Sequence, residues 1–141
     1  MTGHDPFAHF VEAQAPVFDQ ALAELKAGRK KTHWMWYVFP QIAGLGHSAM
    51  AQRYALSSLD EARNYLAHPV LGPRLKQATE AVLSHAVTGA TARSIFGRPD
   101  DLKFHSSLTL FHLAAPGEKL FKEALEAYFQ GRPDPGTTGR V

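Results

Sequence analysis

The residues best suited to chemistry lie in the segment PDDLKFHSSLTLF, residues 99–111, whose composition favours a helix. On a helix, Asp100, Lys103 and Ser107 would follow one line, and Ser106 would be a neighbour of Lys103. Polar side chains on an apolar helix need partners, because burying an unpaired polar group costs free energy. We therefore expect either a surface ion pair between Asp100 and Lys103 or a polar strip facing a pocket. In the pocket alternative, Lys103 would bind a phosphate or act as a general acid, and Asp100 would be a base or orienting group.

A second candidate segment, residues 27–48, places three basic residues before a run of aromatic residues and a pair of glycines. Aromatic faces stack on bases and cations, and backbone N–H groups at a helix start bind anions. A nucleotide-like ligand would suit this combination. The structural alternatives are a buried core, a solvated basic turn and a tight glycine turn. The ligand-binding residues that the pattern predicts, with Ser106 added from the first segment, are Lys31, His33, Trp34, Trp36, Gln41, Gly44, Gly46 and Ser48.

The two tryptophans, Trp34 and Trp36, have apolar neighbours on both sides, so we expect both to be largely buried. Such a pair would serve as core and as pocket wall at once. Residues 33–39 suit a strand by their aromatic and β-branched content, whereas Thr32 as a cap favours a short helix. We favour the helix.

Other kinds of chemistry have little support in the sequence. The chain has no cysteine, and none of its 8 histidines lies in an H-E-x-x-H motif. His105 and His112 would lie roughly 10 Å apart along a helix, which is too far for one ion. There is no nucleophile elbow and no Walker loop. We therefore expect no metal site and no cofactor.

The composition describes one globular domain. The chain has 141 residues, of which 45% are hydrophobic and 20% charged. The 15 basic and 13 acidic residues give a net charge of +2, too small a surplus to favour nucleic-acid binding. No apolar run approaches the roughly 20 residues that span a bilayer, and the first residues do not form a signal peptide. We expect a cytoplasmic protein without a membrane partner; the composition leaves its oligomeric state open.

Helix caps, proline starts and glycine stops recur along the chain and predict about seven or eight short helices. Ser48 and Ser58 are expected to cap two of them. The fold class is therefore all-α, with one compact domain over residues 1–141. Residues 132–141 are expected to form a loop-like C-terminal tail.

Several segments spanning nearly the whole chain resemble a family of domains of unknown function, numbered 1810 and sometimes labelled calpastatin-like. The segments are GRKKTHWMWYVFPQIAGLGHSAMAQRYAL, EARNYLAHPVLGPRL, IFGRPDDLKFHSSLTLF and YFQGRPD. The resemblance implies a compact, mostly helical domain and implies no activity. Calpastatins are disordered and acidic, unlike this chain, so we set the inhibitor label aside. Family members tend to end in a leucine-bearing segment after a G-x-x-D element. Here Gly131 and Asp134 precede PGTTGRV, which argues against a contribution from the far C-terminus.

The function that these patterns favour is binding of a small anionic, nucleotide-like ligand in a pocket with basic and aromatic walls. They leave open whether that ligand is also a substrate. The alternative is a helical protein-interaction module without catalysis, in which the aromatic residues are purely structural.

Overall fold

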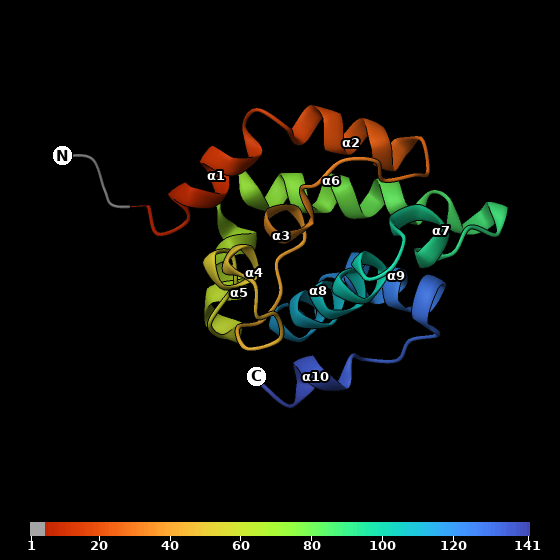
Figure 1. Ribbon diagram of the computed structural model, residues 1–141. Helices are drawn as coiled ribbons and strands as arrows, with labels where there is room; N and C mark the ends of the chain where they lie inside the picture. The colour runs from red at the N-terminus through yellow and green to blue at the C-terminus, as the bar shows by residue number, and fades with distance from the viewer. Residues whose placement is uncertain (1–4) are drawn as a thin grey trace.

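The computed structural model describes residues 5–141, and over that range the chain is built from helices without a β-strand (Figure 1). The expected all-α fold is confirmed. The helices outnumber the seven or eight expected, because several are only one turn long. They are α1 (Ala8–Gln14), α2 (Phe18–Lys26), α3 (Met35–Val38), α4 (Ala49–Arg53), α5 (Leu59–Ala67), α6 (Leu71–Leu83), the 3-10 helix η1 (Ala86–Thr88), α7 (Ala92–Phe96), α8 (Asp100–Ala114), α9 (Lys119–Phe129) and α10 (Pro135–Thr138).

Helix α8 is the centre of the fold. It packs against α5, α7, α9 and α10, while α6 packs against α2, α5 and α9 on another side of the core (Figure 1). Most of its aromatic and aliphatic residues are buried, and with them Asp101, Ser106, Ser107 and Thr109, so the core surrounds most of the helix. Polar side chains on α8 are therefore held in place by the surrounding core, which makes this helix a rigid support for a site.

The segment 33–39 forms a helix, as favoured, but only the single turn α3 is regular. Phe39 follows this turn and packs edge-on against Phe96 and Phe104, with ring centroids 5.8 and 5.1 Å apart. Trp34 is 1% exposed, whereas Trp36 is only partly buried. The expected burial is thus complete for Trp34 and partial for Trp36, which packs against the core. The two indoles are two positions apart on a helical turn and so face different sides.

The C-terminal tail is not loop-like throughout, because residues 135–138 form the helix α10. The Asp134 carboxylate accepts a hydrogen bond from the Thr137 hydroxyl at 2.7 Å, and the Asp134 carbonyl accepts the Thr137 N–H at 3.1 Å. Pro135 at the first position suits a helix start, where the missing N–H costs nothing. Thr137 is fully buried, so the tail packs onto the domain.

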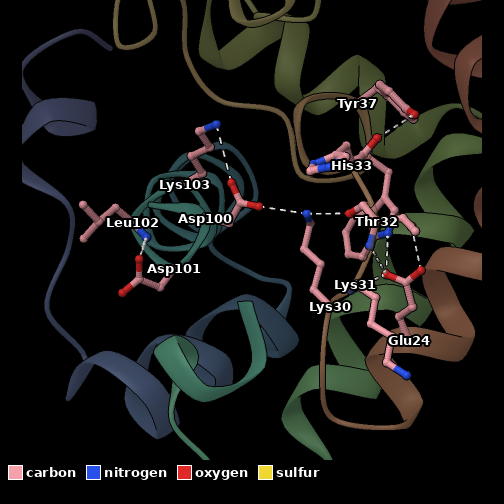
Figure 2. A network of polar contacts seen from close by, with 11 residues as sticks. Glu24, Lys30, Lys31, Thr32, His33, Tyr37, Asp100, Asp101, Leu102 and Lys103 are labelled. Atoms are coloured by element: carbon pink, nitrogen blue, oxygen red, sulfur yellow. Dashed lines mark hydrogen bonds and ion pairs between the residues drawn. The ribbon is translucent and has the colours of Figure 1, made fainter. Parts of the chain in front are cut away.

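The Glu24 carboxylate organises the turn that leads from α2 to α3 (Figure 2). Glu24 is 4% exposed, and its oxygens accept hydrogen bonds from Lys31 N at 2.8 Å and from Thr32 N at 3.0 Å. The Thr32 hydroxyl donates at 2.6 Å and the Trp34 indole N–H at 3.0 Å. Burial by itself would raise the pKa of Glu24. The hydrogen bonds outweigh burial and lower this pKa from 4.5 to about 2.

The depressed pKa of Glu24 predicts an acid-dependent stability. A carboxylate with a lower pKa in the folded state stabilises the fold above its unfolded pKa, and that contribution disappears as the pH falls through the folded pKa. We therefore expect the free energy of unfolding to fall between about pH 5 and pH 2, by at most about 3 kcal/mol for the pKa shift of Glu24. The measurement is urea unfolding across this range for the parent protein and Glu24→Gln. The variant should be less stable at pH 7 and show a flatter acid limb; parallel pH profiles for the two proteins would contradict this.

Candidate functional site

The centre of the candidate site is an ion-pair cluster in which two lysines share the carboxylate of Asp100 (Figure 2). Lys30 Nζ lies 2.9 Å from one carboxylate oxygen and Lys103 Nζ lies 3.5 Å from the other. Asp100 and Lys103 stand one turn apart at the start of α8. The expected pair between them is therefore present, and Lys30 is a third member that the sequence did not indicate.

Lys30 reaches Asp100 from the segment that follows α2. Its backbone N–H donates to the Ile95 carbonyl at 2.7 Å, and its ammonium group also donates to the Thr32 carbonyl at 2.6 Å. The Glu24 carboxylate holds the next two backbone N–H groups of the same segment. The position of Lys30 is thus set by the backbone on both sides, and not only by its ion pair.

The two ammonium groups differ in exposure. The Lys30 side chain is 7% exposed and that of Lys103 is 26% exposed. Each lies over an indole ring, Lys30 at 5.0 Å from the Trp34 centroid and Lys103 at 5.3 Å from that of Trp36. Such contacts stabilise a cation near an aromatic face. Because one carboxylate neutralises only one of two positive charges, the cluster keeps a surplus positive charge at its more exposed member, Lys103.

Lys103 lines a cavity of about 310 Å³, which we call the Lys103 cavity. The lining combines the first turns of α8 with the turn before α4 and with the C-terminal tail. Its residues are Gln41, Leu45, Gly46, Pro99, Leu102, Lys103, His105, Ser106 and Asp134. Four residues named from the sequence therefore meet here: Gln41, Gly46, Lys103 and Ser106. A Cβ on Gly46 would lie 2.4 Å from the Cβ of Ala51, so only glycine fits this close turn.

Asp134 brings a second carboxylate to the Lys103 cavity. Its Oδ2 accepts hydrogen bonds from the hydroxyls of Ser106 and Thr137, both at 2.7 Å. Burial alone would raise the pKa of Asp134. These hydroxyls, with help from the nearby His105 and the Gly136 N–H, outweigh burial and hold the pKa below its usual value. Asp134 is therefore an ionised hydrogen-bond acceptor at neutral pH.

His105 has a fixed orientation at the same cavity. Its ring stacks on Phe129 with centroids 4.0 Å apart and planes inclined by 9°. Its Nε2 lies 2.7 Å from the Arg132 carbonyl, which can only accept, so Nε2 carries the proton. In the neutral ring, Nδ1 is then the acceptor.

The structure places the other sequence-named residues outside the lining of the Lys103 cavity. Lys31 is exposed and extends away from Asp100, and His33 is exposed with its carbonyl accepting the Tyr37 hydroxyl at 3.4 Å (Figure 2). Trp34 is buried with its N–H on Glu24. Gly44 has a positive φ of 96° and lies against the Arg140 side chain. Ser48 caps α4 by accepting the Ala51 N–H at 3.1 Å, as the sequence predicted.

Sequence reasoning missed two polar residues of the Lys103 cavity, His105 and Asp134. His105 follows Lys103 by two positions, which on an ideal helix would turn it to another side. The expectation that the far C-terminus contributes nothing also needs correction, because Thr137 supports Asp134. The sequence does contain one signal for Asp134, because Thr137 follows it by three residues. At a helix start, this spacing allows a threonine hydroxyl to donate a hydrogen bond to the carboxylate.

Some kinds of site find no counterpart in the structure. In residues 5–141, no three side chains among His, Asp and Glu cluster in a way that would hold a metal ion. Within the same described range, no helix combines the length and apolar character needed to cross a membrane.

The fold and the site define a small all-α domain with a cavity beside a lysine-rich ion-pair cluster. The chain belongs to the family described as Protein of unknown function (DUF1810), whose model matches residues 5–141. It is similar to a solved structure, that of the conserved hypothetical protein Rv1873 from Mycobacterium tuberculosis. The two chains are 50% identical, with a TM-score of 0.91, and the match covers 96% of each. No curated protein matches the chain significantly.

The unequal roles of Lys30 and Lys103 predict unequal effects on stability. Lys30→Met removes the more buried ammonium and its bond to the Thr32 carbonyl, so we expect a loss of about 2–3 kcal/mol. Lys103→Met leaves Asp100 paired with Lys30 and should cost less than about 1 kcal/mol. Urea unfolding of both variants beside the parent protein measures the difference. Equal losses of stability in the two variants, or a larger loss for Lys103→Met, would show that the surplus positive charge of the cluster does not lie on Lys103.

Proposed function

We propose that the Lys103 cavity binds a small nucleotide-like ligand, with an anionic group such as a phosphate on the Lys103 ammonium. The observation that carries this proposal is the sharing of Asp100 between two ammonium groups, at 2.9 and 3.5 Å. The surplus charge falls on the lysine that lines the cavity. A charged donor to an anion makes a stronger hydrogen bond than a neutral one, so Lys103 is the favoured contact.

The size and lining of the cavity limit the ligand. A volume of about 310 Å³ lies at the lower end of the roughly 300–1,000 Å³ typical of small-molecule sites. This supports a mononucleotide or a sugar phosphate rather than a dinucleotide. The Asp134 carboxylate supports the nucleotide-like character, because carboxylates in nucleotide sites accept hydrogen bonds from ribose hydroxyls. The negative charge of Asp134 also disfavours a ligand that carries negative charge along its whole length.

Asp100 and Lys103 have different roles in this proposal. Asp100 takes part in two ion pairs and does not line the cavity, which supports an orienting role over that of a general base. Lys103 would be the group that touches the ligand and, in a reaction, the acid that donates a proton. Trp36 would keep the Lys103 ammonium in place through its ring face. We therefore propose ligand binding as the primary role of this site.

The second candidate is a protein-interaction module. Leu102 is 49% exposed and belongs to the lining of the Lys103 cavity, so an apolar side chain of a partner has a contact available there.

As part of the leading proposal we place the protein in the cytoplasm of a bacterium. The chain has no cysteine, which fits a reducing compartment, and the similar solved structure is bacterial.

Calorimetric titration with adenosine 5′-monophosphate and ribose 5-phosphate tests the ligand proposal. We expect saturable binding to the parent protein, at least about tenfold weaker in Lys103→Met, because a charged hydrogen bond to the phosphate is lost. Lys122→Met is the matched control: it removes the same charge from an exposed position on α9 and should bind as the parent does. Adenosine and ribose without phosphate should bind weakly to all three proteins. Absence of binding across the panel would reject the nucleotide proposal and leave the interaction module.

A further inference from the structure

A second basic cavity, which we call the Arg93 cavity, lies between the segment after α2 and helix α7. Its volume is about 260 Å³, and its lining includes Arg29, Lys30, Arg93 and Gly97 but no acidic residue. It shares no lining residue with the Lys103 cavity. Arg29 belongs to the basic run of the sequence that the proposed ligand site does not use.

Backbone hydrogen bonds fix the two sides of the Arg93 cavity relative to each other. The Lys30 N–H donates to the Ile95 carbonyl at 2.7 Å and so ties the Arg29 segment to α7. The Arg29 N–H donates to the Glu24 carbonyl at 3.1 Å, and the Gly97 N–H to the Arg93 carbonyl at 2.8 Å. The two arginines therefore project from backbone positions that are held together before any ligand arrives.

The guanidinium groups of Arg29 and Arg93 are charged and have no carboxylate partner among residues 5–141. Both residues are exposed, and neither takes part in an ion pair in the described part of the chain. The neighbouring carboxylates are already engaged. Asp100 is shared by two lysines, and Asp101 pairs with Arg98 at 3.3 Å while accepting the Leu102 N–H at 2.9 Å.

The charge of the Arg93 cavity comes from three basic residues in its lining, Arg29, Lys30 and Arg93. Lys30 is paired with Asp100 at 2.9 Å, whereas the two arginines have no ion-pair partner among residues 5–141. The lining therefore carries a net positive charge. A positive potential at a cavity attracts anions.

We propose that the Arg93 cavity is a separate anion site that takes a single phosphate group between Arg29 and Arg93. Planar guanidinium groups match phosphate oxygens in pairs, which favours a phosphate over a halide. The volume is below that of typical small-molecule sites, so the site suits a phosphate ion or a phosphate at the end of a molecule rather than a whole nucleotide.

Titration of the isotope-labelled protein with inorganic phosphate, followed by amide NMR, tests this site. We expect saturable shifts at the amides of Arg29, Arg93 and Gly97 that potassium chloride at equal ionic strength does not produce. Arg29→Gln/Arg93→Gln should weaken this binding at least about tenfold. Lys119→Gln/Lys122→Gln is the control, because it removes the same net charge from exposed positions on α9. Melting curves of all variants check that they are folded.

The same titration on Lys103→Met separates the two sites. Phosphate shifts around Arg93 should persist in that variant even if the Lys103 cavity binds nothing. The Arg93 site is rejected if chloride reproduces the shifts, if the shifts do not saturate, or if the control double variant weakens binding as much as the arginine double variant.

Discussion

The ammonium groups of Lys30 and Lys103 lie 2.9 and 3.5 Å from one carboxylate, that of Asp100. The Asp100 carboxylate at the start of α8 suits the positive end of the helix and neutralises one lysine. The second lysine therefore keeps its charge. Because Lys30 is the more deeply buried and closer of the two, Lys103 is the member that presents charge to the Lys103 cavity. The chemistry proposed for the site depends on this unequal sharing.

The unequal sharing depends in turn on Glu24. Its carboxylate binds two successive backbone N–H groups and the Trp34 indole, and so fixes the segment that carries Lys30. A buried carboxylate that accepts five hydrogen bonds would leave several donors unsatisfied if it were removed. Two carboxylates on different helices thus set the geometry of the cluster, Glu24 through the backbone and Asp100 through the side chains.

The sequence was most informative where contacts are local. Helical spacing predicted the pair between Asp100 and Lys103, and capping chemistry predicted Ser48 at the start of α4. The all-α fold followed from the same local signals. The basic run predicts Lys31 as the ligand-binding lysine, but spacing cannot distinguish it from its neighbour, and Lys30 is the residue that pairs with Asp100 on α8. Glu24 sets this difference, because it binds the segment that carries Lys30 through partners seven to ten residues away.

Contacts between distant segments were beyond sequence patterns. Asp134 meets Ser106 across 28 positions because α10 folds back onto α8, and no periodicity encodes such a return. Trp34 and Trp36 looked equivalent in the sequence, yet a helical turn directs one into the core and leaves the other beside Lys103. Four of the candidate residues line the Lys103 cavity because α8 and the turn before α4 are adjacent in the fold, a proximity that a single sequence does not reveal.

A crystal structure of the protein with ribose 5-phosphate tests the central claim most directly. The account predicts a phosphate oxygen within hydrogen-bond reach of Lys103 Nζ, about 2.7–3.2 Å, and a ribose hydroxyl on the Asp134 carboxylate. It also predicts that Lys30 stays on Asp100 in the complex. A ligand bound elsewhere with the Lys103 cavity free of it, or a complex in which Lys30 rather than Lys103 binds the phosphate, would contradict the account.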